Sequence, residues 1–103
     1  MIALGKWSFT INTFFYSGCC TVEIFDNNGQ YDFNLIEPVL KNTPEIKLIS
    51  AKEVGSNIDA AISIPSARLN NIPLHAEING DKLRGFITLP FLGDIPIKDG
   101  KKV

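Results

Sequence analysis

The chain has 103 residues, a formal net charge of −1 at pH 7 and a hydrophobic fraction of 45%. This length corresponds to one domain, residues 1–103, that is large enough to bury a core. Charges of both signs are interspersed and nearly balance, so the sequence predicts neither nucleic acid nor a membrane surface as a partner. No apolar run is long enough to span a bilayer, and the few residues before Lys6 leave no room for a signal peptide, so we expect a cytoplasmic protein.

The first three predicted strands alternate apolar and polar residues. The apolar faces of the first two strands consist of Trp7, Phe9, Ile11, Cys20, Val22 and Ile24. Between these strands, residues 13–18 break the alternation and are predicted to form an aromatic loop. Asn28-Gly29 is typical of the centre of a two-residue turn, which would pair Ile24 with Phe33 and bring the apolar faces of the second and third strands together.

The middle of the chain predicts two further strands between longer connections. Residues 37–44 contain two prolines and form a connection, and residues 45–54 form a strand whose phase is lost near Ile49, which indicates a bulge. Residues 55–57 are predicted to make a three-residue turn. The next inward face consists of Ile58, Ala60, Ile62 and Ile64, and residues 65–71 form another long connection.

Residues 72–90 carry the strongest hairpin signal, because two alternating runs flank Asn79-Gly80. A type I′ turn centred on these two residues predicts the pairs Ile78–Asp81, Glu77–Lys82, Ala76–Leu83, His75–Arg84 and Leu74–Gly85. After a connection at 90–94, Ile95 and Ile97 belong to a last strand, in which Asp99-Gly100 is either a further turn or a bulge.

Eight strands with alternating long and short connections predict an all-β, antiparallel up-and-down barrel. In such a meander the short turns (27–29, 55–57 and 79–80) share one end, and the longer connections (13–18, 37–44, 65–71 and 90–94) share the other. Closure into a barrel removes the exposed edges of the sheet. The alternative is an open antiparallel sheet or a β-sandwich with the same hairpins.

Gly5-Lys6-Trp7 resembles the Gly-x-Trp motif that lipocalins and their calycin relatives carry at the start of the first strand. The resemblance implies that Trp7 plugs the closed end of an eight-stranded barrel and that a small apolar ligand enters the opposite end. Members of that family place an arginine over the tryptophan, where this chain offers Lys101 or Lys102. The chain is shorter than typical lipocalins and lacks the polar biotin-binding set of avidin-like members, so the resemblance implies no particular ligand.

The predicted ligand-binding residues are aromatic and aliphatic side chains at the long-connection end, together with one inward tyrosine. They are Phe14, Phe15, Tyr16, Tyr31, Leu69, Phe91 and Leu92. The apolar rim among them is a ligand portal, a partner surface or a lid packed shut. Inside the barrel, Ala60, Ala76 and Gly85 would leave room, and Tyr31 either orients a ligand or pairs with Asp26.

The densest ionisable cluster is His75, Glu77, Lys82 and Arg84, which reads either as an acid/base pair with an anion-holding arginine or as cross-strand pairs on a solvated face. The sequence contains no motif for catalysis, so we assign no catalytic residue and no cofactor. Cys19 and Cys20 should point to opposite faces as reduced thiols, and with a single histidine they cannot supply a metal site.

Three functions follow as hypotheses. The first is a barrel that binds a small apolar molecule. The second is a non-catalytic module for protein interaction or homodimer formation, for which the outward apolar residues Phe25, Ile36, Ile49, Ala61 and Phe86 would supply a surface. The third is a small enzyme that uses His75 with Glu77.

Overall fold

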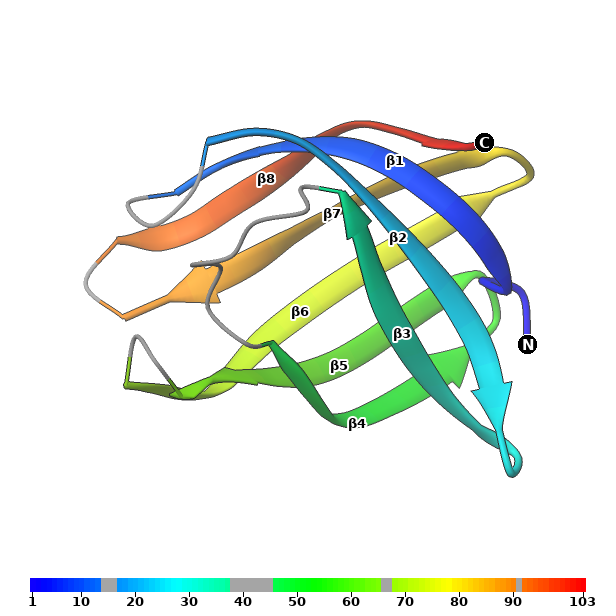
Figure 1. Ribbon diagram of the computed structural model, residues 1–103, viewed down its shortest axis with the longest axis horizontal. Coiled ribbons are helices and arrows are strands. Elements are labelled where there is room, and N and C mark those ends of the chain that lie inside the picture. The colour runs from blue at the N-terminus through cyan, green and yellow to red at the C-terminus, as the bar shows by residue number, and fades with distance from the viewer. Residues whose placement is uncertain (14–16, 38–45, 66–67, 91) are drawn as a thin grey trace.

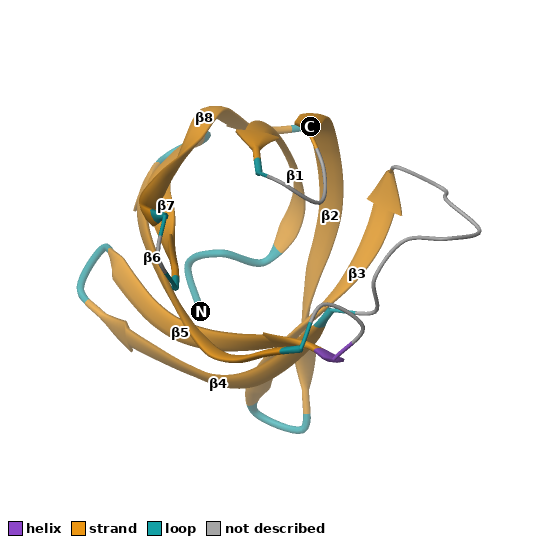
Figure 2. Ribbon diagram, turned by 90° about the vertical axis from the view of Figure 1, so that its left-hand side faces the viewer, coloured by secondary structure: helices purple, strands orange, loops and turns teal. Residues whose placement is uncertain are grey.

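The computed structural model describes residues 1–13, 17–37, 46–65, 68–90 and 92–103. Its strands are β1 (Gly5–Asn12), β2 (Ser17–Asn27), β3 (Gln30–Glu37), β4 (Lys47–Val54), β5 (Asn57–Ile64), β6 (Leu69–Asn79), β7 (Lys82–Leu89) and β8 (Gly93–Lys102). All eight belong to one antiparallel sheet in the order β3-β2-β1-β8-β7-β6-β5-β4. The sheet curls on itself, so the predicted all-β up-and-down barrel is confirmed (Figures 1 and 2).

The barrel is nearly but not fully closed. Backbone hydrogen bonds join β1 to β8 and every pair of consecutive strands except β3 and β4. These two strands therefore form the edges of the sheet and face each other across a junction without a ladder, which we call the seam. An edge strand leaves one row of backbone groups without a strand partner, so among the described strands the seam is the one junction where the wall is not hydrogen-bonded.

The turn between β2 and β3 follows the sequence-based prediction. Asn28 and Gly29 have φ values of 55° and 86°, the positive pair that a type I′ turn requires. Asn27 consequently pairs with Gln30, and Ile24 pairs with Phe33, as predicted.

Two other predicted turns are wrong in register. The loop between β4 and β5 is the two-residue Gly55-Ser56, and the loop between β6 and β7 is Gly80-Asp81. In each loop only the first residue, a glycine, has positive φ, at 63° and 61°, which is the type II′ pattern.

The pairs in the β6–β7 hairpin therefore differ from those predicted. They are Asn79–Lys82, Ile78–Leu83, Glu77–Arg84, Ala76–Gly85, His75–Phe86 and Leu74–Ile87. This register differs from the prediction by two residues. Because side chains alternate with a period of two, the same side chains still face inward.

Bulges correct the phase of two strands. The pairing of β4 with β5 shifts between Leu48 and Ser50, which confirms the predicted bulge near Ile49. In β8, Asp99 has a φ of 55° and the strand continues to Lys102, so the Asp99-Gly100 feature is a bulge and not a turn. The predicted connection at 65–71 is too long, because β6 begins at Leu69.

The connections sort by length between the two ends of the barrel. The three two-residue turns lie at one end, where β1 also begins and β8 finishes; we call this the tight-turn end (Figure 1, right). The strand ends that the longer connections join lie at the opposite, long-connection end. This arrangement follows from the up-and-down order, because each strand reverses the direction of the one before.

Buried apolar side chains form two clusters. One surrounds Trp7 near the tight-turn end and consists of Ala3, Trp7, Ile58, Ala76, Ile78 and Leu83. The other lies toward the long-connection end and consists of Ile62, Ile64, Ile72, Ile87 and Leu89. Both draw mainly on β5, β6 and β7, whereas the inward side chains of β2 other than Cys20, and those of β3, are only half-buried. No helix in the described part of the chain has the length and apolar character needed to cross a membrane.

Candidate functional site

The barrel interior contains a cavity of about 210 Å³ that is partly open to the outside. Every strand contributes side chains to its wall, among them Phe9 of β1, Val22 of β2, Phe33 of β3 and Ala60 of β5. The alternation seen in the sequence explains this arrangement, because every second residue of a strand points to the same face. Apart from Cys20, Tyr31 and Asp32, all residues lining the cavity are apolar.

The polar groups at the wall already have partners. The carboxylate of Asp32 accepts hydrogen bonds from the amide nitrogen of Asn27 at 3.3 Å and from the backbone N–H of Phe33 at 2.8 Å. The hydroxyl of Tyr31 contacts Glu53 and Ala3. In the described part of the chain, no buried side-chain nitrogen or oxygen lacks a hydrogen-bond partner. The cavity therefore offers a ligand an apolar surface and no orphaned polar group.

Of the three small residues that were predicted to leave room in the interior, two do so and one does not. Ala60 and Ala76 line it, as expected. Gly85 does not: a Cβ atom at this position would lie 2.1 Å from the carbonyl oxygen of His75. This glycine is therefore needed for close approach of two backbones, and the expectation that it leaves room in the interior is wrong.

Residues 1–4, which we call the strap, lie across the tight-turn end. Trp7 is fully buried, and its indole Nε1–H donates a hydrogen bond of 2.9 Å to the carbonyl oxygen of Ala3. The Lys102 ammonium lies 5.9 Å from the centre of the Trp7 ring, within the range of a cation–π contact. Through these contacts Trp7 closes the tight-turn end, where the sequence pattern predicted it to lie.

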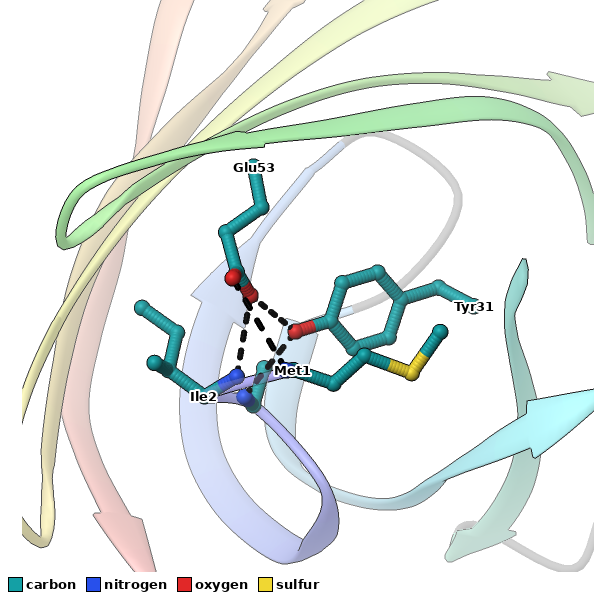
Figure 3. A network of polar contacts seen from close by, with 5 residues as sticks. Met1, Ile2, Tyr31 and Glu53 are labelled. Carbon is teal, nitrogen blue, oxygen red and sulfur yellow. Dashed lines mark hydrogen bonds and ion pairs between the residues drawn. The ribbon is translucent and has the colours of Figure 1, made fainter. Parts of the chain in front are cut away.

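A carboxylate and a phenol hold the strap (Figure 3). The Tyr31 hydroxyl donates to Glu53 Oε1 and accepts a hydrogen bond of 3.2 Å from the N–H of Ala3. Glu53 Oε1 also accepts from the N–H of Ile2 at 2.9 Å, and its Oε2 lies 3.8 Å from the amino group of Met1. Strand β3 and strand β4 are thus both attached to the strap.

The same contacts shift two pKa values. Burial raises the pKa of the Tyr31 hydroxyl above its ordinary value of 10.0, and the neighbouring Glu53 carboxylate raises it further. The hydrogen bond from Tyr31 lowers the pKa of Glu53 below its ordinary value of 4.5, and the N–H of Ile2 acts in the same direction. Both shifts favour a neutral phenol beside an ionised carboxylate, and a hydrogen bond to an ionised acceptor is stronger than one between neutral groups.

The predicted ligand-binding residues fall into three groups. Phe14, Phe15, Tyr16 and Phe91 lie outside the described residues. Leu69 is half-buried and packs against the cluster at the long-connection end, and Leu92 is 54% exposed. Tyr31 lines the cavity, but it does so near the tight-turn end, and its hydroxyl bonds to Glu53 instead of Asp26.

Sequence reasoning missed Glu53, although a signal for it was present. The bulge near Ile49 moves the inward phase of β4 from Leu48 to Ala51, and continued alternation then brings Glu53 to an inward position opposite Ile58. Glu53 nevertheless stays exposed near the end of β4, where its carboxylate contacts Tyr31 and the strap. The predicted bulge and the alternation indicate its orientation, whereas its partners follow only from the tertiary structure.

The ionisable cluster lies on the outer face of the barrel. His75 Nδ1 is 2.7 Å from Asp59 Oδ1, and the His75 ring stacks on Phe86 with the ring centres 5.5 Å apart. Glu77 lies opposite Arg84. None of these side chains lines the interior cavity, so they are separated from it by the wall of the barrel.

The two cysteines lie on opposite faces, as expected: Cys20 is buried and lines the cavity, and Cys19 is exposed with its Sγ 3.3 Å from Ser8 Oγ. Among the described residues, no group of three or more His, Cys, Asp or Glu side chains is arranged to hold a metal ion. Comparison of the chain with protein-family models, with curated proteins and with solved structures found no match.

Proposed function

We propose that this barrel binds a small, uncharged, apolar ligand in its interior. The observation that carries the proposal is the cavity of about 210 Å³, which is lined by apolar side chains from all eight strands. A well-packed interior contains few voids larger than a water molecule, so a space of this size in a small domain is suited to a ligand.

The volume limits the size of the ligand. An apolar cavity of about 150 Å³ is large enough to bind benzene, whereas pockets for drug-sized molecules measure about 300–1,000 Å³. The cavity here lies between these values. The ligand is therefore the size of one or two small rings or of a short alkyl chain.

The lining limits the charge of the ligand. The Tyr31 hydroxyl and the Asp32 carboxylate are already hydrogen-bonded within the protein. A charged group carried into the cavity would lose its hydration without gaining a partner, which costs several kcal/mol or more.

The resemblance to the lipocalin and calycin pattern supports the binding of an apolar ligand and its entry from the long-connection end. Trp7 plugs the tight-turn end, and Lys102 lies over its ring as the arginine of that family would. Access from the long-connection end would bring a ligand past the predicted rim, which includes Leu69 and Leu92.

Thermal unfolding in the presence of toluene, naphthalene and sodium hexanoate tests the proposal. Toluene and naphthalene should raise the melting temperature, because a ligand at one hundred times its Kd stabilises the folded state by about 2.7 kcal/mol. Hexanoate should not. Ala60→Ile, which takes up part of the cavity, should reduce the shift, most of all for naphthalene, and Ala61→Ile, on the outer face of the same strand, should retain it. The absence of a shift with any neutral compound would reject this function.

A second candidate is self-association through an edge of the sheet. Ile49 and Val54 lie on the edge strand β4 and are 51% and 60% exposed. Exposed apolar residues on an edge strand favour pairing with another chain. Light scattering should then report a dimer that Ile49→Lys converts to a monomer, whereas a monomeric wild-type protein would exclude this candidate.

A further inference from the structure

The seam between β3 and β4 differs from every other junction in the barrel. Ladders of backbone hydrogen bonds join all the other neighbouring strands, and none joins these two. Parting any other pair would break a row of backbone hydrogen bonds, each of which contributes to stability. The seam can open without breaking such a row.

The cavity extends to both sides of the seam. Phe33 and Leu35 of β3 line it, and so do Leu48 and Ala51 of β4. All four side chains are half-buried, so none of them is locked into a fully packed core. Movement of β3 away from β4 would therefore expose the cavity directly.

One side-chain hydrogen bond crosses the seam. It joins the Tyr31 hydroxyl of β3 to the Glu53 carboxylate of β4, and in the described part of the chain no other hydrogen bond or ion pair links side chains of these strands. The strap reinforces it from both sides, because Ala3 donates to Tyr31 and Ile2 donates to Glu53. Figure 3 shows these groups converging at one point.

We propose that the barrel opens at the seam between β3 and β4, and that the Tyr31–Glu53 hydrogen bond with the strap is the latch that holds it shut. Opening at this seam adds a lateral route to the cavity beside access from the long-connection end, and it thereby changes how fast the ligand reaches the cavity; this role rests on the proposed function. The position of the latch explains its effect. Among the strands that the structure describes, β3 and β4 are the neighbours that lack a ladder, and the latch joins them at the end where the strap contacts both.

The reactivity of the buried Cys20 thiol reports opening without any ligand. Cys20 lines the cavity, and a Cys19→Ser background removes the exposed thiol. In that background, labelling of Cys20 by a water-soluble disulfide reagent should be about three to ten times faster in Tyr31→Phe, as expected for the loss of one hydrogen bond. Labelling should also be faster in Glu53→Gln, because a neutral amide oxygen accepts a weaker hydrogen bond from Tyr31 than a carboxylate does. Exchange of 4-fluorotoluene, followed by fluorine NMR, should show association and dissociation faster by a similar factor.

Two controls separate the latch from general destabilisation. Asp59→Asn makes the same carboxylate-to-amide change in a contact with His75, between strands that a ladder already joins. Ile72→Val removes one buried methylene group at a position that does not line the cavity, and it lowers global stability without touching the seam. Both should label Cys20 within about twofold of the background protein, after correction for global unfolding measured in urea.

The outcomes distinguish the two proposals. Faster labelling in the latch variants alone supports opening at the seam, even if 4-fluorotoluene fails to bind, and that failure would count only against the proposed function. Equal labelling in the latch variants and the controls would overturn the latch, even if 4-fluorotoluene binds to the wild-type protein.

Discussion

Replacing Ala60 by isoleucine tests directly whether the interior is hollow. Ala60 is an inward residue of β5 that lines the cavity, and its chain neighbour Ala61 is an outward residue that does not. The sign of the change in unfolding free energy depends on the space beside Ala60. A hollow interior accepts the larger side chain, whereas a filled interior is overpacked by it.

The expected magnitude follows from the atoms that the substitution adds. Isoleucine brings three more carbon atoms than alanine, and their burial is worth roughly 2.4 kcal/mol at about 0.8 kcal/mol each. Ordering the larger side chain costs about 0.5–1 kcal/mol, so Ala60→Ile should raise the free energy of unfolding by about 1.5 kcal/mol. In a filled core the same substitution would lower it by about 1–3 kcal/mol.

Urea unfolding followed by circular dichroism measures this change. Ala61→Ile is the matched control, because it adds the same atoms to the outer face of the same strand and should change stability by no more than about 0.5 kcal/mol. Destabilisation of Ala60→Ile by 1 kcal/mol or more, with an unchanged control, would refute the cavity and the ligand-binding proposal with it.

Three further predictions concern backbone packing and the strap. Gly85→Ala should lower the free energy of unfolding, measured in urea, by about 1–3 kcal/mol, because its Cβ would lie 2.1 Å from the carbonyl oxygen of His75 in β6. An unchanged free energy of unfolding would mean that β6 and β7 are farther apart than described. Trp7→Phe should lower the free energy of unfolding by about 2–4 kcal/mol, because the buried carbonyl of Ala3 loses its donor and a smaller ring occupies the site. A decrease of less than about 1 kcal/mol would contradict the described hydrogen bond. Because Tyr31 lowers the pKa of Glu53, the stabilisation from this carboxylate should be complete above about pH 4.5 and lost as the pH falls through its folded-state pKa. Wild type should therefore exceed Glu53→Gln in urea midpoint at pH 7, and the difference should shrink toward pH 3; a difference that does not change with pH would contradict this linkage.

Much of the barrel was predictable, because alternation and turn residues are local signals. The inward faces and the pairing of Ile24 with Phe33 follow from residues close together in the chain. The register of the β6–β7 hairpin was not predictable in the same way, since Gly80 suits the second position of one turn type and the first position of another. The two registers bury the same side chains, so burial alone could not choose between them.

The candidate site was less predictable than the fold. The expected site lay at the rim, and four of its residues fall outside the described part of the chain. Tyr31 was predicted to face inward, and it lines the cavity. Its partners Glu53 and Ala3 are distant in sequence, so they could not be predicted from nearby residues. Only the curvature of the sheet determines that β3 and β4 meet.

The amino-acid sequence by itself determined that every strand has one apolar face and that short and long connections alternate. These properties are set by local preferences of the backbone and by the period of two along a strand. The tertiary structure alone decided where the barrel stays unjoined, that a space of about 210 Å³ remains inside it, and that Glu53 and the strap meet Tyr31 at the seam. These properties depend on how far the sheet curls and how side chains from all eight strands share one interior, which no local stretch of sequence specifies.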